Sequence, residues 1–172
     1  MFYKYYMTEI AVTHNALLVN YFQFVLERVP NMTYFCQSAN LPGIVFGSVE
    51  QPTVLGHPVK VPTGAFRFED LELTFRVDEN LTNWREIHNW IKTTGNYESD
   101  DHTLSYKEKT SDARLLITNS SYRPKIAVKF KHVFPISLSG LNFNTTAIDS
   151  LEMTASVKFA FTGYEIETLA NL

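Results

Sequence analysis

Apolar side chains occupy every second position across residues 151–161, and this pattern constrains the fold more than any other feature of the chain. Successive side chains of a β-strand point to opposite faces of a sheet, so a period of two predicts one long strand with a single buried face. Residues 71–77 repeat the pattern and predict a second amphipathic strand. The apolar positions of the two segments are Leu71, Leu73, Phe75, Val77, Leu151, Met153, Ala155, Val157, Phe159 and Phe161.

Shorter stretches of the same alternation occur elsewhere in the chain. Residues 21–28 and 32–36 flank a break at Pro30 and predict two antiparallel strands joined by a tight turn, with Cys36 facing inward. Residues 115–118 and 126–134 predict further strands. Phe and Tyr, at 13 and 9 residues, favour strands over helices. The expected fold is mainly β, an antiparallel β-sandwich or barrel of about six or seven strands with one flanking α-helix.

One segment, residues 81–93, carries a helical period instead. Its apolar residues recur every third or fourth position and form one stripe, as in a helix that packs on a sheet. Asn80 or Thr82 is expected to cap its N-terminus, and Gly95 to end it. Trp90 lies off the stripe, so a ligand-binding role for exposed aromatic residues stays open. The stripe consists of Leu81, Trp84, Ile87 and Ile91.

Two segments have the composition of surface structure. Residues 50–66 contain three prolines and two glycines, so they predict an extended, exposed excursion in which residues 59–61 form an edge strand or an arm. Residues 95–114 show no period and predict a long loop. Residues 1–19 are expected to form an N-terminal arm, and the length of 172 residues predicts a single domain, residues 1–172.

The charge of the chain argues against tight binding of nucleic acid. Lys and Arg number 15 against 18 Asp and Glu, a formal net charge of -3, whereas phosphate contacts supply most non-specific affinity for DNA. Lys60, Lys129 and Lys131 are too dispersed to form a basic groove. No run approaches the ~20 apolar residues of a membrane span. The N-terminal residues lack a signal-peptide pattern, so folding in the cytosol is expected.

The sequence offers little material for catalysis or metal binding. The five histidines are scattered and Cys36 is the only cysteine, so we expect no disulfide within the chain, no metal site and no cofactor. No nucleophile elbow or phosphate-binding loop occurs, and we expect no enzyme. The alternative is an enzyme that uses His102 with Asp100 or Asp101. These residues lie in the most polar loop of the sequence, where no burial is expected to shift the pKa values of their side chains.

Several segments of this chain are predicted to be sheet edges or extended arms that lack a partner within the chain. An unpaired sheet edge must be covered, blunted or used. The residues alone therefore favour a structural or assembly protein whose edges are completed by copies of itself.

The order and spacing of its segments resemble the tail tube proteins of contractile-tailed bacteriophages of the T-even type. The resemblance covers about residues 20–165. The residues before Tyr21 are long for a tube subunit, which leaves room for the related tube-initiator proteins of the same fold. The segments that carry the resemblance are 21–25, 33–37, 39–44, 51–62, 68–75, the helix with Trp84 and Trp90, 127–135 and 151–161.

The resemblance implies a structural virion protein without enzymatic activity. Its hexameric rings would stack head to tail into the inner tube of a contractile tail, through which DNA passes during ejection. The implied partners are other copies of the chain, the tail sheath protein, and the baseplate tube-initiator and tail-terminator proteins, with no membrane. The implied location is the virion, after assembly in the host cytoplasm. The alternatives are a tube-initiator, tail-terminal ring or secretion-system tube protein of the same fold, or, in another class, a β-sandwich enzyme or ligand-binding module.

By the same resemblance, residues 50–66 and 95–114 are candidates for contacts between rings. The acidic balance of the chain then suits the wall of a DNA conduit, because each neutralised phosphate would slow passage. The candidate contact residues are Pro52, Leu55, His57, Pro58, Val59, Val61, Asp100, Asp101 and His102.

Overall fold

The computed structural model describes residues 17, 20–53, 56–95, 105–145 and 152–169, and it is mainly β and antiparallel, as the alternation predicts. The strands are β1 (Phe22–Leu26), β2 (Cys36–Ala39), β3 (Ile44–Gln51), β4 (Val59–Phe68), β5 (Leu71–Arg76), β6 (Ser111–Thr118), β7 (Pro124–Leu138), β8 (Thr154–Ala160) and β9 (Gly163–Thr168). The helices are α1 (Pro30–Phe35), α2 (Thr82–Thr94) and α3 (Tyr106–Lys109).

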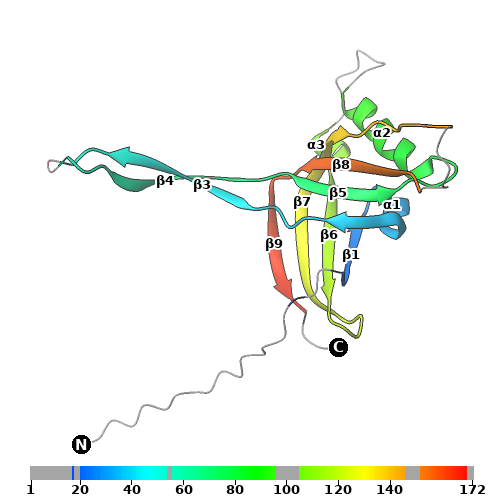
Figure 1. Cartoon of the computed structure of the whole chain (residues 1–172), viewed down its shortest axis with the longest axis horizontal. Helices are drawn as coiled ribbons and strands as arrows, with labels where there is room; N and C mark the ends of the chain where they lie inside the picture. Colours follow the sequence, from blue (N-terminus) through cyan, green and yellow to red (C-terminus); the bar gives the residue numbers. More distant parts are fainter. Residues whose placement is uncertain (1–16, 18–19, 54–55, 96–104, 146–151, 170–172) are drawn as a thin grey trace, which may run out of the picture.

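Seven of the strands form one sheet that is folded over on itself. Its order is β1-β6-β7-β8-β5-β2, and β9 pairs with β7 beside this path. Every pairing is antiparallel. Figure 1 shows two halves that cross each other, with β1, β6, β7 and β9 in one half and β8, β5 and β2 in the other. The remaining two strands, β3 and β4, form a separate hairpin.

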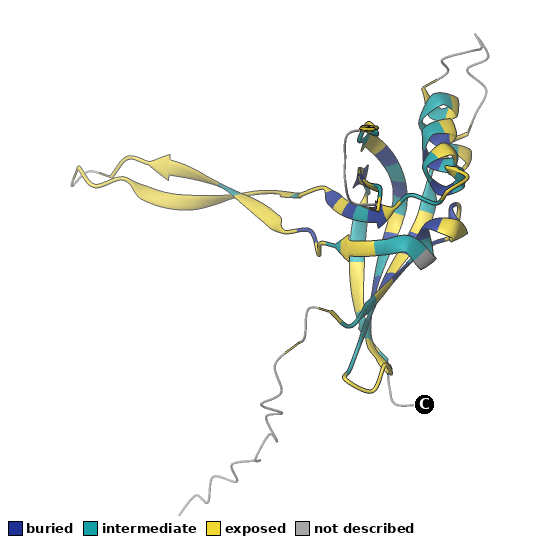
Figure 2. Cartoon of the chain, turned by 45° about the vertical axis from the view of Figure 1, so that its right-hand side comes forward, coloured by how far each residue is buried: buried dark blue, intermediate teal, exposed yellow. Residues whose placement is uncertain are grey.

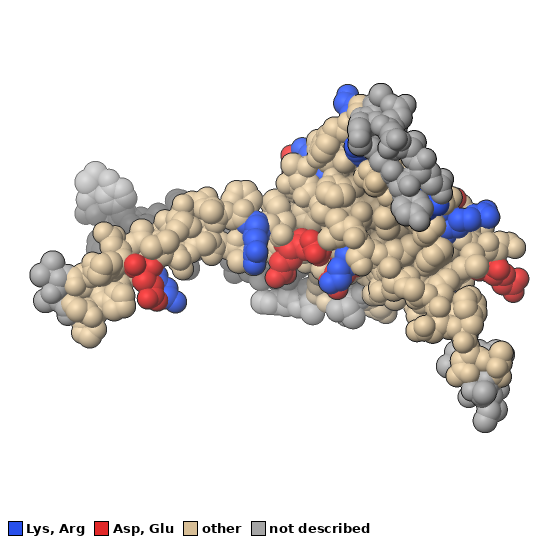
Figure 3. Space-filling view, turned by 90° about the horizontal axis from the view of Figure 1, so that it is seen from above, with Lys and Arg blue, Asp and Glu red and all other residues tan. Residues whose placement is uncertain are grey.

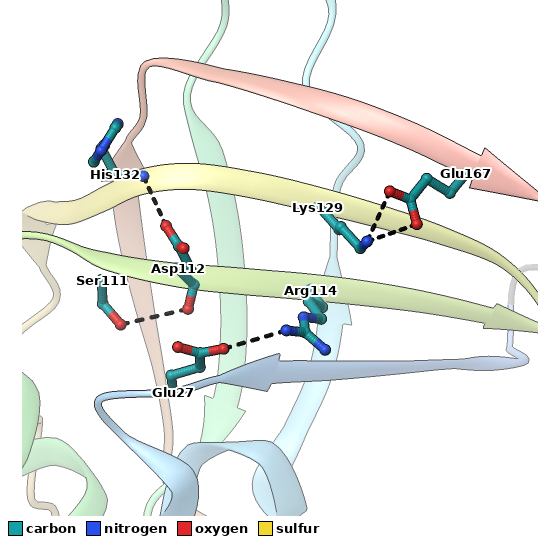
Figure 4. Close-up of polar contacts among 7 residues, drawn as sticks. All are labelled: Glu27, Ser111, Asp112, Arg114, Lys129, His132 and Glu167. Carbon is teal, nitrogen blue, oxygen red and sulfur yellow. Dashed lines mark hydrogen bonds and ion pairs between the residues drawn. The ribbon is translucent and has the colours of Figure 1, made fainter.

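Strand β7 belongs to both halves because it bends in its middle. Residues 126–130 pair with both β6 and β9, whereas the stretch from Phe134 to Leu138 pairs with β8. At the bend His132 has a φ of 55°, which is uncommon for a residue other than glycine. Its backbone N–H donates a hydrogen bond to Oδ1 of Asp112 at 3.2 Å (Figure 4). The ring of His132 also lies 5.2 Å from that of Tyr106.

The hydrophobic core lies between the two halves and beneath α1 and α2 (Figure 2). Strands β5 and β8 pair so that Leu73 lies opposite Val157 and Phe75 opposite Ala155, with these side chains inward. The two alternations found in the sequence therefore meet in one layer of the core. The largest fully buried side chains are Phe24, Phe75, Phe130, Phe159, Leu26, Met32, Leu71, Leu73, Ile87, Val29, Val128 and Val133.

Residues 30–35 form helix α1, and the predicted hairpin of strands 21–28 and 32–36 is wrong. Pro30 occupies the start of the helix, where its missing N–H is not needed. Met32 is buried, as predicted, but a run this short cannot distinguish one helical turn from a strand. Strand β1 pairs with β6, and β2 pairs with β5.

Helix α2 is the predicted helix, and three residues of the predicted stripe, Trp84, Ile87 and Ile91, face the core. Ile87 and Trp90 are buried, whereas Trp84 is only partly buried and stacks on the ring of His88 at 5.1 Å. Trp90 is 3% exposed, so it is not a surface aromatic residue available to a ligand. The fourth predicted stripe residue, Leu81, precedes the helix and is its cap residue.

The N-terminus of α2 is capped from outside the helix. Leu81 is the cap residue and has a φ of 56°, and neither Asn80 nor Thr82 caps the helix with its side chain. Oδ1 of Asp78 instead accepts a hydrogen bond from the N–H of Thr82 at 2.6 Å. Gly95 ends the helix as predicted, and its N–H donates to the carbonyl of Ile91.

The loop predicted for residues 95–114 is shorter than expected. Residues 106–109 form α3, and β6 begins at Ser111. Ser105 and Glu108 form a capping box, in which each accepts a hydrogen bond from the backbone of the other, so a short helix forms without apolar periodicity. Residues 96–104 lie outside the described residues.

Candidate assembly surfaces

Strands β3 and β4 extend as an antiparallel hairpin away from the rest of the molecule (Figures 1 and 2). We call residues 44–68 the arm. Its register runs from Ile44 opposite Phe68 at the root to Gln51 opposite Val59 near the tip. Pro62 lies inside β4, which a two-stranded ribbon tolerates because each of its strands has one unpaired edge.

The arm carries large apolar side chains that lie exposed, with no other described segment covering them. Fully burying one such side chain is worth about 1.5–3 kcal/mol relative to leaving it in water. The arm holds only three charged residues, and Figure 3 shows long uncharged stretches along it. A contiguous apolar surface of this kind marks an interaction site. Its exposed apolar residues include Ile44 (57%), Phe46 (54%), Val49 (57%), Val59 (52%) and Phe66 (60%).

The root of the arm is joined to β9 and to the start of β5. The hydroxyl of Tyr164 in β9 donates a hydrogen bond to the carbonyl of Pro42 at 3.2 Å. The ring of Phe68 lies 5.1 Å from the ring of Tyr164. The side chain of Asn40 accepts from the N–H of Glu72 at 2.7 Å and donates to the carbonyl of Asp70 at 3.1 Å. These contacts set the direction in which the arm leaves the sheet.

The sequence-predicted contact residues fall into two groups. The first group lies exposed in the outer half of the arm and comprises Pro52, His57, Pro58, Val59 and Val61. There the hydroxyl of Thr53 donates to the carbonyl of His57 at 2.6 Å and closes the turn. The second group lies outside the described residues and comprises Leu55, Asp100, Asp101 and His102.

Sequence reasoning missed the apolar residues at the root of the arm. Phe46 lies directly opposite Phe66 in the hairpin, and both side chains are more than half exposed. In the sequence, Ile44 and Phe46 belong to an apolar run that reads like a core strand. The sequence does contain a sign of this exposure: the apolar run is followed by a segment rich in proline and glycine. A hairpin made of these two segments forms a two-stranded ribbon with no other described sheet or helix packed on it.

The seven-stranded sheet leaves both outer strands of one half without a second neighbour. Within the described residues, β1 pairs only with β6, and β9 pairs only with β7. Because β6 and β7 lie between them, the two free edges are on opposite sides of this half. Unpaired N–H and C=O groups along such an edge are a template for another strand.

The solvent-facing side of this half carries charged residues that pair across neighbouring strands. Figure 4 shows Arg114 of β6 directed toward Glu27 and Lys129 of β7 directed toward Glu167 of β9. We call this surface the paired-charge face. Its three ion pairs are Arg114–Glu27 at 3.5 Å, Lys129–Glu167 at 2.6 Å and Lys131–Glu165 at 2.5 Å.

The described part of the chain holds no cluster of three or more His, Cys, Asp or Glu residues suited to a metal ion. Burial raises the pKa of Cys36 to about 11, so its thiol is not an activated nucleophile. The hollow at the root of the arm is lined by Arg67 and by the carboxylates of Glu69, Asp70 and Glu72. None of the described helices has the length and apolar character needed to cross a membrane.

Comparison with known proteins agrees with this arrangement of sheet, helix and arm. A sequence model described as phage tail tube protein matches residues 3–167. The chain belongs to the phage tail tube protein family. This tail tube family member is thus a structural protein of the tail tube or tube terminator type, which confirms the resemblance seen in the sequence.

Known relatives of this tail tube family member include terminators. The tail tube terminator protein of Enterobacteria phage T4 is 25% identical over 138 residues, which are 78% of each chain. In fold, the chain resembles the tube terminating cap of the anti-feeding prophage, with a TM-score of 0.66, 14% identity, and 96% and 100% of the two chains covered. It also resembles a chain of the PVC sheath-tube complex of an extracellular contractile injection system, with a TM-score of 0.61, 18% identity, and 95% and 98% covered.

Proposed function

We propose that this tail tube family member forms a closed ring at the inner tube of a contractile tail and that the ring terminates the tube. The observation that carries the proposal is the pair of free edges, β1 and β9, on opposite sides of one half of the sheet. The β9 edge of one copy pairs with the β1 edge of the next. Because the two edges differ, this contact is heterologous, and such contacts generate a ring when the rotation closes. Following the family resemblance, we assign six copies to the ring.

The arm provides a second contact between copies. Its exposed apolar side chains, Phe46 and Phe66 among them, gain free energy when a neighbouring subunit covers them. We therefore extend the predicted contact surface from the tip of the arm to its root. The tip contributes Pro52, Leu55, His57, Pro58, Val59 and Val61, and Asp100, Asp101 and His102 remain predicted contacts from the loop.

A terminator is favoured over a repeating tube subunit by the relatives. The matched T4 protein is a tail tube terminator, and the anti-feeding prophage chain is a tube terminating cap. The tube subunit itself is the second candidate, and the family description and the likeness to the PVC sheath-tube complex favour it. In either role the protein acts by assembly and not by catalysis.

The proposed setting follows from this role. The ring assembles in the host cytoplasm, becomes part of the virion tail, contacts the sheath protein and neighbouring tube components, and surrounds a channel through which DNA passes. The half of the sheet formed by β1, β6, β7 and β9 faces that channel. The halves from successive subunits then form one continuous wall, with the paired-charge face exposed to the DNA.

Size-exclusion chromatography with light scattering, followed by negative-stain microscopy of the purified full chain, tests this proposal. We expect closed rings of six copies that do not lengthen when the protein is concentrated. Tubes that grow from baseplates would assign the protein to the tube itself. A chain that stays monomeric at high concentration, and forms no rings in the presence of baseplates or tails, would contradict the proposal that it assembles into a ring.

A further inference from the structure

The cations of the paired-charge face form a stripe that lies between two acidic borders. The strand register places Arg114 directly opposite Lys129, and Lys131 follows on the same face of β7. Like charges directly opposite each other in a sheet repel. Glu27 flanks this stripe on the β1 side, and two carboxylates of β9 flank it on the other. The two carboxylates of β9 are those of Glu165 and Glu167.

These ion pairs contribute little to folding. All six side chains are about half exposed, between 40% and 58%. Exposed pairs of this kind are worth about 0–1 kcal/mol each. The main effect of these ion pairs is therefore on the charge of the surface. Each of the three cations already has a carboxylate partner, so the surface carries little unpaired positive charge.

A row of three neighbouring cations is otherwise suited to a polyanion. Lys and Arg that neutralise phosphates release counterions from DNA, and this release supplies most of its non-specific affinity for proteins. On this face a phosphate has to compete with a carboxylate that is fixed on the adjacent strand. Lys125, at the start of β7, has no ion pair within the described residues, so a weak residual contact is expected in the unchanged protein.

We propose that Glu27, Glu165 and Glu167 prevent the channel wall from holding DNA, by occupying the cations that would otherwise bind its phosphates. The inference rests on the proposed function, because the face meets DNA only when it lines a channel. On this view local ion pairing, and not the net charge of the chain, keeps DNA from binding to the wall. A chain of the same net charge without these pairs would bind DNA.

Fluorescence anisotropy of a labelled double-stranded DNA duplex, titrated with the purified full chain at several salt concentrations, tests the inference. The variant E165Q/E167Q frees Lys129 and Lys131 without changing the size of any side chain appreciably. We expect it to bind the duplex at low salt more tightly than the unchanged protein. With two more phosphates contacted, the slope of log K against log salt should steepen by about 1.8.

A matched control is available on the other half of the sheet. Glu72 pairs with Lys158, and Glu152 pairs with Arg76, so E72Q/E152Q makes the same change in charge and frees the same number of cations. Arg76 lies four residues along β5 from Glu72, the partner of Lys158, so the freed cations are separated by roughly 13 Å and do not form a stripe. An equal gain in DNA binding by both variants would overturn the inference.

A second control returns the net charge to its original value. K129Q/K131Q added to E165Q/E167Q removes the cations as well, and DNA binding should fall to the level of the unchanged protein. Binding that persists in this fourfold variant contradicts the inference. If the double variant does not fold, as judged by circular dichroism, E165Q and E167Q are measured singly, with an expected change in slope of about 0.9 each.

The DNA measurement and the ring measurement separate the two proposals. A protein that forms rings, but whose variants gain no DNA binding, overturns this inference and leaves the proposed function standing. A protein that forms no rings, but whose E165Q/E167Q variant gains DNA binding, overturns the proposed function and leaves the pairing mechanism standing.

Discussion

The indole N–H of Trp90 donates a hydrogen bond to the backbone carbonyl of Lys109 at 2.9 Å and joins α2 to the C-terminal residue of α3. The guanidinium of Arg28 lies 4.9 Å from the centre of the same ring. The ring of Phe159 lies 6.0 Å away on the core side. A single side chain thus links three segments that are far apart in the sequence.

The variant Trp90→Phe should lower the free energy of unfolding by about 1–3 kcal/mol, because it leaves the partly buried carbonyl of Lys109 without its donor. Urea unfolding followed by circular dichroism measures this loss. Trp84→Phe is the matched control, since Trp84 donates to the carbonyl of Ser139 at 3.2 Å from a less buried position. Its loss should be smaller, and equal losses would contradict the role assigned to Trp90.

Polar substitutions on the arm should block assembly without affecting folding. In F46S/F66S, two large apolar side chains that are 54% and 60% exposed in the isolated chain are removed, so the monomer loses little. Sedimentation velocity should show rings replaced by monomers. Phe143→Ser is the control, because Phe143 is 79% exposed but lies between β7 and β8, away from the arm. If F46S/F66S forms rings normally, the arm does not contribute to the contact between copies.

The thiol of Cys36 should react slowly in the folded protein. Burial raises its pKa from 9.0 to about 11, so at pH 8 the thiolate that attacks an alkylating reagent is scarce. Iodoacetamide labelling followed by mass spectrometry should give a rate at least tenfold below that of the urea-unfolded chain, as expected from about two pKa units of difference. Equal rates in the two states would show that Cys36 is not protected.

The same shift makes stability depend on alkaline pH. The folded chain keeps the Cys36 proton at pH values where the unfolded chain has lost it. The contribution of Cys36 to stability is therefore present below pH 9 and is lost as the pH rises toward about 11. The variant Cys36→Ala should show a shallower decline in the free energy of unfolding across this range, and an unchanged decline would contradict the assignment.

Acid pH should weaken the paired-charge face. A hydrogen bond from Lys131, together with its charge, lowers the pKa of Glu165 below its ordinary 4.5. The contribution of Glu165 to stability is present above pH 4.5 and is lost as the pH falls through the lowered value. E165Q should flatten the decline in the free energy of unfolding at acid pH, and Lys131→Gln should flatten it similarly. A decline that neither variant alters would refute the coupling.

The strands that can be predicted from the sequence are those whose two faces differ most in polarity. Strands β5 and β8 were predictable because alternation reports burial directly, and Leu73 and Val157 do face each other in the core. Helix α1 was not predictable, since Met32 fits the buried position of a strand and of a helical turn equally well. Trp90 was missed because its partner, the carbonyl of Lys109, comes from a segment without periodicity.

The assembly surfaces were harder to predict than the fold. The apolar residues of the arm resemble core residues in the sequence, and only the absence of a covering layer in the described structure distinguishes them. The paired-charge face depends on the register of β7 against β9, which brings Lys129 near Glu167 across 38 positions of sequence. The net charge of the chain does not reveal this pairing, because it counts charges without their positions.

The bend at His132 has a mechanical consequence. Since β7 pairs with β6 and β9 in one half of the folded sheet and with β8 in the other, the two halves share one continuous strand. A load on the half formed by β1, β6, β7 and β9 is therefore transmitted along one continuous backbone to the half formed by β8, β5 and β2. The chain should therefore unfold as a single cooperative unit, and amide protons of β7 should be the last to exchange with solvent.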